Sequence, residues 1–219
     1  MLTKKEKKEY VFGKLDELLK PLGYKALKTG GDPCYILDEN EYRCKFYLNF
    51  SDRGDLYFSK YSMSLKVVEN IVEEINTLVS FNLDKKRYII PTVFDSSENP
   101  YIYEIIGTRE DLENFTNWML DYLKNDGQKF IETYFYLPNV LKKMNDLEQK
   151  GKNWNELLSG TLDSNFRGLI IAKLCNDSAF DDKVKKLDVK FSQKGYEEWL
   201  PYYEKLKERL KSIESIYDI

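Results

Sequence analysis

The chain has 219 residues, a net charge of −3 and no histidine, and 42% of its residues are hydrophobic. Without histidine it lacks the commonest general base near neutral pH and the commonest metal ligand, which excludes histidine-dependent catalytic triads and zinc sites. The slightly negative net charge creates no electrostatic field that would attract nucleic acid or anionic lipid. We therefore expect a folded protein with a real core, no bound metal, no nucleic-acid partner and no membrane partner.

The first expected element is a helix over residues 3–20. Thr3 followed by Glu6 is a capping box, which marks a helix N-terminus. Apolar residues then recur at helical spacing until Pro21 and Gly23 end the pattern.

A sheet is predicted next. Short strands at 24–28 and 34–37 precede residues 42–51, in which apolar and polar side chains alternate. This alternation predicts a strand with one buried face and one solvent-exposed face. A turn at 52–55 leads into a further strand at 56–61, which gives an antiparallel meander.

Helices are expected to cover this sheet. Residues 64–80 carry the strongest apolar helical stripe in the chain, and a second capping box opens a helix over 108–124. Between them, strands at 87–93 and 101–106 predict a second hairpin.

The strand pattern disappears after about residue 125, and the rest of the chain is predicted to be helical. The last segment carries an apolar heptad stripe that is too short for a free coiled coil, so we expect it to dock within the chain. The predicted fold class is therefore α+β: an antiparallel sheet covered by helices, followed by an all-α C-terminal region. The expected division is a sheet domain at 1–124 and a helical region at 125–219 docked on it.

The three cysteines, Cys34, Cys44 and Cys175, form no C-x-x-C pair, and we expect buried free thiols. An odd-length loop centred on Glu39 would place Cys34 directly opposite Cys44, which leaves a disulfide open. The N-terminus has no apolar region of a signal peptide, and no apolar run approaches the roughly 18 residues that span a bilayer. We expect a cytoplasmic protein, and disulfides are rare in the cytoplasm.

Motifs for catalysis and cofactors are weak. No glycine-rich phosphate loop is present, so we expect no cofactor. Asp188-Val189-Lys190 has the spacing of a PD-(D/E)xK nuclease, but it follows a lysine-rich helical stretch and is expected to be chance. Three carboxylate pairs suit turns and helix N-termini better than catalysis. These pairs are Asp52 with Asp55, Asp181 with Asp182, and Glu197 with Glu198.

Clustered aromatic residues are the more unusual feature. Neighbouring tyrosines on a helix point in different directions, so they cannot all be buried against one surface. Tyr202, for example, is displaced by about 100° from Tyr203. We expect either a seam between sheet and helices or a partner-binding patch. The predicted patch consists of Tyr134, Tyr136, Trp199 and Tyr202, with an acidic rim that includes Glu197 and Glu198.

The motif L-x-x-L-L-K-P-L-G-Y at residues 15–24, with the strand F-Y-L-N-F at 46–50, resembles a group of small bacterial domains. These domains begin with a helix, a Leu-Gly-aromatic turn and an antiparallel sheet, and some are similar to immunity proteins of bacterial toxin systems. The resemblance covers about residues 10–60 and implies no catalytic residue. The abundant Lys, Asn, Ile and Tyr are also typical of an AT-rich bacterial genome.

The leading functional hypothesis is a cytoplasmic, non-catalytic binding protein with a protein partner, in its narrower form an immunity-type inhibitor. Two alternatives stay open. One is a metal-dependent hydrolase or nuclease that uses carboxylates and lysine, and the other is a small-molecule binding module between the two halves. Nothing in the sequence sets the oligomeric state.

Overall fold

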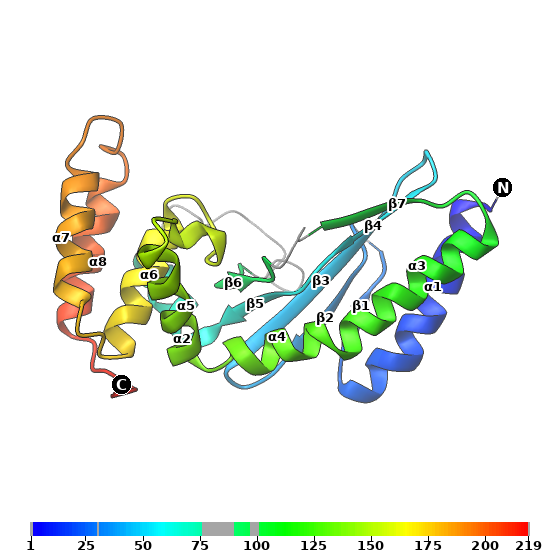
Figure 1. Ribbon diagram of the computed structural model, residues 1–219, viewed down its shortest axis with the longest axis horizontal. Helices are drawn as coiled ribbons and strands as arrows, with labels where there is room; N and C mark the ends of the chain where they lie inside the picture. The colour runs from blue at the N-terminus through cyan, green and yellow to red at the C-terminus, as the bar shows by residue number, and fades with distance from the viewer. Residues whose placement is uncertain (1, 30, 76–89, 97–100, 219) are drawn as a thin grey trace. The chain divides into compact units, whose positions relative to one another are not determined.

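The computed structural model describes residues 2–29, 31–75, 90–96 and 101–218. It has the α+β fold predicted from the sequence: an antiparallel sheet, helices packed with it, and a helical C-terminal region (Figure 1). The described residues form two compact units. The first, here called the sheet unit, comprises residues 2–63, 94–96 and 101–133 without residue 30. The second, here called the helical unit, comprises residues 64–75, 90–93 and 134–218.

Helix α1 spans Lys4–Leu19 and confirms the first predicted element. Its capping box is complete, because the Glu6 backbone N–H donates to Thr3 Oγ1 at 3.2 Å and the Thr3 N–H donates to Glu6 Oε2 at 2.7 Å. A short 3₁₀ turn, η1 (Lys20–Leu22), follows, and Gly23 ends it with φ of 86°. This left-handed conformation suits glycine, and it turns the chain into the sheet.

The sheet is antiparallel throughout its main path, β1-β2-β3-β4-β7. The strands are β1 (Lys25–Leu27), β2 (Cys34–Asp38), β3 (Tyr42–Phe50), β4 (Asp55–Ser59) and β7 (Tyr101–Ile105). The alternation predicted for β3 is confirmed, since Cys44, Phe46 and Leu48 are all completely buried while Asn49 is exposed. One face of the strand therefore belongs to the core.

The register between β2 and β3 corrects the expectation for the cysteines. Cys34 pairs with Tyr47 and Leu37 pairs with Cys44, so the connection has an even rather than an odd length. Because side chains alternate along a strand, Cys34 and Cys44 point to opposite faces of the sheet. Both are free and buried, as is Cys175, and the expectation of buried thiols is confirmed.

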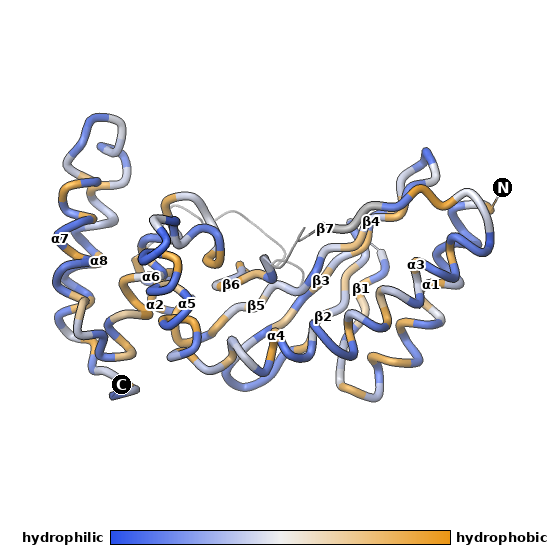
Figure 2. The backbone as a smooth tube through the Cα atoms, in the orientation of Figure 1, coloured by the Kyte–Doolittle hydropathy of each residue, from blue (hydrophilic) through white to orange (hydrophobic). Residues whose placement is uncertain are grey.

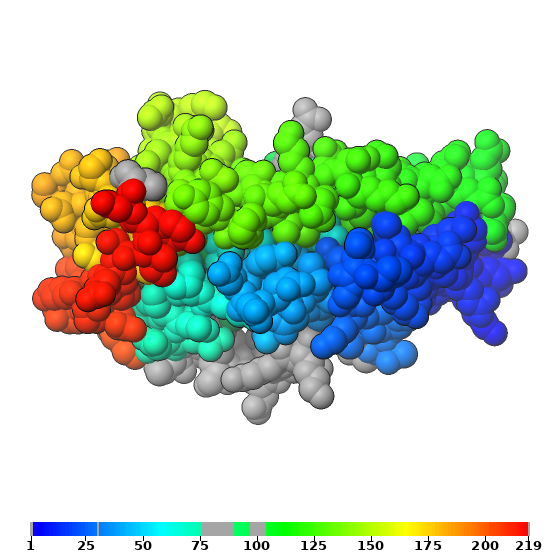
Figure 3. All heavy atoms as spheres, turned by 90° about the horizontal axis from the view of Figure 1, so that it is seen from below, coloured from blue at the N-terminus to red at the C-terminus, as the bar shows by residue number. Residues whose placement is uncertain are grey.

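Two helices of the sheet unit, α1 and α3 (Arg109–Lys124), lie side by side on the same face of the sheet, and α4 (Asp126–Tyr134) follows α3 (Figures 1 and 3). The second predicted capping box is present at the start of α3. The core beneath these helices is aromatic: Phe58 meets Phe46 and Tyr122 edge-to-face, with ring centroids 5.3 and 5.5 Å apart. Such aromatic pairs stabilise a core beyond the area they bury.

The helix predicted at 64–80 differs from expectation in both start and packing. Residues Ser62–Leu65 form strand β5, which pairs with β3 and with β6 (Val93–Phe94), and the helix α2 spans Lys66–Ile75. We expected α2 to cover the sheet, and this was wrong, because its apolar stripe packs against two helices of the helical unit. Much of the predicted strand 87–93 lies outside the described residues. Its end, β6, pairs with β5 rather than forming the expected hairpin with β7.

The helical unit contains α2, α5 (Leu137–Gln149), η3 (Trp154–Glu156), α6 (Asp163–Leu174), α7 (Phe180–Phe191) and α8 (Leu200–Lys211). Helix α6 is buried along nearly its whole length and contacts α2, α5, α7 and α8. Helix α8 shows hydrophobic and hydrophilic stretches in alternation (Figure 2), and its stripe residues Tyr203, Leu206 and Leu210 are buried. Docking of this stripe within the chain is thereby confirmed. Among the described residues, no helix is long and apolar enough to cross a membrane.

Candidate ligand-binding site

A pocket of about 360 Å³ lies within the helical unit. The end of α5, the η3 turn, the start of α6 and one face of α7 form its wall. Its lining is polar and rich in lysine. The lysines are Lys152, Lys183, Lys186 and Lys190, and the other polar residues include Asn153, Asn155, Thr161, Ser164, Asn165 and Tyr196.

Helical periodicity brings three of the lysines to one face of α7. Lys183, Lys186 and Lys190 are separated by three and four residues, which places them on neighbouring turns of the same helix face. Leu187, on the same face, is buried and anchors it to the unit. A lysine stripe therefore borders the pocket.

Lys183 is the structural member of this stripe. Its side chain is 3% exposed, and its Nζ lies 2.8 Å from Asp177 Oδ2 and 3.1 Å from Glu148 Oε2. It also donates to Asn145 Oδ1 at 2.9 Å. A buried ammonium needs such partners, and here they neutralise it.

Two further lysines are balanced by carboxylates near the surface. Lys186 Nζ lies 3.2 Å from Glu148 Oε1, and Lys152 Nζ lies 2.7 Å from Glu156 Oε2. Exposed pairs of this kind are weak and exchange readily with other ions. These two lysines can therefore turn toward an anion that enters the pocket.

Lys190 differs from the other three. Its Nζ donates to the neutral amide oxygen Oδ1 of Asn165 at 3.3 Å and lies 5.9 Å from the ring centroid of Tyr196. Within the described part of the chain, no carboxylate lies at ion-pair distance from it. Burial lowers the pKa of the Lys190 amine, because a desolvated ammonium is less stable than a hydrated one.

The pocket wall depends on close packing between Trp154 and α6. Trp154 is 9% exposed, and its indole lies so close to Gly168 that a Cβ added there would come within 2.2 Å of Cε3. Glycine is therefore required at this position of α6 by direct contact. The packing fixes the η3 turn and with it Asn153 and Asn155.

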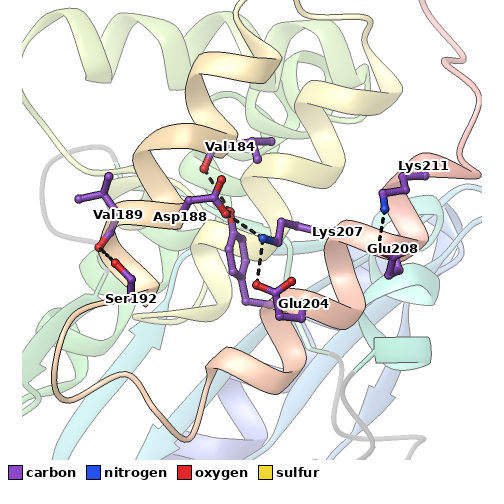
Figure 4. A network of polar contacts seen from close by, with 9 residues as sticks. Val184, Asp188, Val189, Ser192, Glu204, Lys207, Glu208 and Lys211 are labelled. Carbon is purple, nitrogen blue, oxygen red and sulfur yellow. Dashed lines mark hydrogen bonds and ion pairs between the residues drawn. The ribbon is translucent and has the colours of Figure 1, made fainter.

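Helix α7 presents a different set of contacts toward α8. Asp188 accepts hydrogen bonds from the Tyr203 hydroxyl at 3.1 Å and from Lys207 Nζ at 2.9 Å (Figure 4). Asp188 thus joins two helices, whereas Lys190 borders the pocket. The Asp188-Val189-Lys190 spacing lies on a helix, as expected from its context, and does not form a nuclease-type strand.

The six residues of the predicted aromatic patch occupy two separate places. Tyr134 ends α4, and Tyr136 precedes α5 and meets Tyr217 edge-to-face at 5.3 Å. Trp199 precedes α8 and lies 6.0 Å from Phe166. Since Tyr217 follows α8 and Trp199 precedes it, the two groups lie at opposite ends of a helix about 18 Å long.

The remaining members of the predicted patch lie near Trp199. Tyr202 is half-buried, and Glu197 and Glu198 are exposed. Both glutamates were expected in the first turn of the last helix, but α8 begins only at Leu200, because Pro201 favours the first helical turn. Tyr196, just before them, lines the lysine-rich pocket.

The described residues contain no group of three or more Cys, Asp and Glu side chains that could hold a metal ion. Comparison with protein families, curated proteins and solved structures finds no match to this chain. Sequence reasoning missed the pocket, although the spacing of the α7 lysines was available as a signal. The polar wall opposite them comes from distant segments and carries no local pattern.

Proposed function

We propose that this chain is a cytoplasmic, non-catalytic binding protein whose ligand site is the lysine-lined pocket, and that the ligand presents an anionic group there. The observation that carries the proposal is the environment of Lys190. This half-buried cation faces a neutral amide and a tyrosine ring, with no carboxylate at ion-pair distance among the described residues.

Physical chemistry favours an anion at this position. A partly desolvated ammonium gains more from a charge-assisted hydrogen bond than from a neutral acceptor. The amides and hydroxyls on the opposite wall can donate further hydrogen bonds that fix the orientation of the ligand. A volume of about 360 Å³ is at the small end of ligand pockets, so the ligand is a small molecule or a single side-chain-sized group.

Thermal shift with acetate, succinate, inorganic phosphate and AMP tests the proposal, because a ligand that binds only the folded protein raises its melting temperature. At least one of these anions should raise the melting temperature of the wild type. The Lys190→Gln variant should lose this response. Lys185→Gln is the matched control, since Lys185 lies on the same helix, is exposed and does not line the pocket. An equal response in both variants would contradict the proposed site.

A protein partner is a second candidate function. It is favoured by an exposed apolar surface in which Phe135 and Tyr136 are 42% and 41% exposed and Ile216 is 57% exposed. Exposed apolar side chains that adjoin each other are typical of interaction sites. The immunity-type inhibitor remains the narrower form of this candidate.

Its test starts from the neighbouring genes: where a toxin reading frame adjoins the gene of this chain, the purified toxin is titrated with the protein. Tyr136→Ser should weaken binding by about tenfold if Tyr136 is a contact hot spot. The control is Tyr202→Ser at the other end of α8. A loss of binding confined to Tyr202→Ser would instead place the partner at the residues around Trp199.

A further inference from the structure

We infer that Lys190 Nζ is the reactive amine of this pocket and forms a reversible imine with a small α-oxo acid, a compound that carries a carbonyl beside a carboxylate. The inference rests on the proposed function and deepens it. The carboxylate is the anionic group of the ligand, and the carbonyl is the group that Lys190 captures.

The contacts of the four pocket lysines distinguish Lys190 from the rest. Lys183 is 3% exposed and held between two carboxylates, so its amine is not accessible to a ligand. Lys186 and Lys152 each form an ion pair with a glutamate. Lys190 Nζ instead donates a hydrogen bond to the Asn165 amide oxygen and lies near the Tyr196 ring, and no carboxylate among the described residues is at ion-pair distance.

An amine attacks a carbonyl only when it is unprotonated. Burial acts in this direction at Lys190, because desolvation lowers the pKa of its amine. Besides Lys190, the charged groups that line the pocket are Glu148 on α5, Lys152 before η3, and Lys183 and Lys186 on α7, and Lys152 pairs with Glu156. Lys186 lies one turn before Lys190 and can hold the carboxylate of the ligand when it leaves Glu148.

The step balances without a cofactor. The nitrogen lone pair of Lys190 attacks the carbonyl carbon, the carbonyl π electrons move to oxygen, and a proton passes from the nitrogen to that oxygen to give a carbinolamine. The hydroxyl then leaves with the second nitrogen proton as water while the nitrogen lone pair forms the carbon–nitrogen double bond, and addition of water reverses the step. The amide and hydroxyl groups of Asn165, Ser164 and Thr161 line the same space and can hydrogen-bond the ligand during the exchange.

The test traps the imine by reduction. Folded protein is incubated with glyoxylate and cyanoborohydride, which delivers hydride to the imine carbon and leaves a stable carboxymethyl-lysine. Site-resolved mass spectrometry then compares the rate at Lys190 with the rate at Lys185. We expect Lys190 to be labelled about tenfold faster, the lower end of the gain that a cleft of one charge sign gives an oppositely charged ligand.

Two controls separate recognition from general lysine chemistry. Acetaldehyde, which has no carboxylate, should label Lys190 with much less preference, and protein unfolded in urea should show none. Equal labelling of Lys190 and Lys185 by glyoxylate in the folded protein would overturn the inference.

The variant Lys190→Arg distinguishes this inference from the proposed function, because arginine keeps the charge but cannot form the imine. It should retain the thermal shift with acetate or phosphate and lose the fast labelling site. If the wild type shows the thermal shift but no selective labelling, anion binding stands and the imine fails. If neither appears, both fail.

Discussion

Arg167 holds Glu69 in a two-pronged ion pair inside the helical unit. Its Nε donates to Glu69 Oε1 at 2.8 Å and its Nη2 donates to Oε2 at 2.7 Å, with the two side chains only 3% and 9% exposed. The Thr92 hydroxyl donates to the same carboxylate at 2.6 Å, and Nη1 of the guanidinium donates to the Ser159 carbonyl at 3.0 Å. The pair therefore joins α2 to α6 with its polar groups satisfied.

Removing one member of this pair should be strongly destabilising. Glu69→Ala leaves a buried guanidinium without its two-pronged partner, and we expect the free energy of unfolding to fall by about 3–5 kcal/mol. Urea unfolding followed by circular dichroism measures the change.

The exposed pair between Arg209 and Glu74 supplies the matched control, since Glu74 lies on the same helix α2. Glu74→Ala should cost no more than about 1 kcal/mol. Similar losses for the two variants would show that the buried pair is not the link between α2 and α6.

Gly168→Ala should destabilise the helical unit by about 1–3 kcal/mol or more, the usual cost of overpacking. The added methyl group would overlap the Trp154 indole, as the 2.2 Å approach shows. Chemical denaturation measures the stability, with circular dichroism as the signal.

Gly13→Ala is the contrasting substitution. Gly13 lies within α1, and nothing lies within 4 Å of an added Cβ. Alanine is a better helix former than glycine, so this variant should gain about 0.5–1 kcal/mol. A gain at Gly168 as well would contradict the close packing of Trp154.

Asp16 should make the sheet unit sensitive to acid. Burial alone would raise the pKa of this carboxyl, but hydrogen bonds from Lys20, Lys28 and Tyr35 outweigh burial and lower the pKa from 3.8 to about 2. A carboxyl with a lowered pKa in the folded state stabilises the protein above its unfolded pKa, and this stabilisation disappears as the pH falls through the folded pKa.

Asp16→Asn should therefore lower the free energy of unfolding by about 2 kcal/mol at pH 7. The difference from the wild type should shrink as the pH falls below 3.8 and vanish near pH 2. Urea titrations at several pH values measure it. The exposed Asp52, paired with Lys4, gives the control variant Asp52→Asn, for which we expect little change. A difference that persists unchanged below pH 2 would contradict the charge-based explanation.

Phe46 lies at the centre of the aromatic core of the sheet unit. It is completely buried and packs against Tyr35, Phe58 and Tyr61. Phe46→Ala should cost about 3–5 kcal/mol, as expected for removal of a buried ring. Amide exchange should also protect Cys44 and Leu48 on the same strand, and exchange there as fast as at the termini would contradict the placement of β3 in the core.

The features that the sequence predicted well are those set by neighbouring residues. The capping boxes at Thr3 and Thr108 and the alternation along β3 each depend on a few adjacent side chains, and the structure contains all three. Strand β5 was missed because its four residues look like a helix cap, and its conformation is decided by pairing with β3 and β6.

Packing partners and the pocket depend on residues that are far apart in the chain. The apolar stripe of α2 shows that the helix is buried but does not show against which surface. In the same way, Lys190 acquires its character from Asn165 and Tyr196, which come from other segments. The expected patch divided because Trp199 precedes α8, whereas Tyr136 precedes α5 and packs against Tyr217, which follows α8.

The interleaving of the two units has a consequence for synthesis and for fragment design. Residues 64–75 lie between segments of the sheet unit, but their partners α6 and α8 begin at residues 163 and 200. On the ribosome, α2 therefore emerges long before the surface that buries it, and its valines and isoleucines stay exposed until α6 and α8 have been made. A fragment that begins at residue 134 would likewise lack α2, and apolar surface of α6 and α8 would be left uncovered. Joining residues 64–75 to this C-terminal fragment through a linker would restore the missing helix.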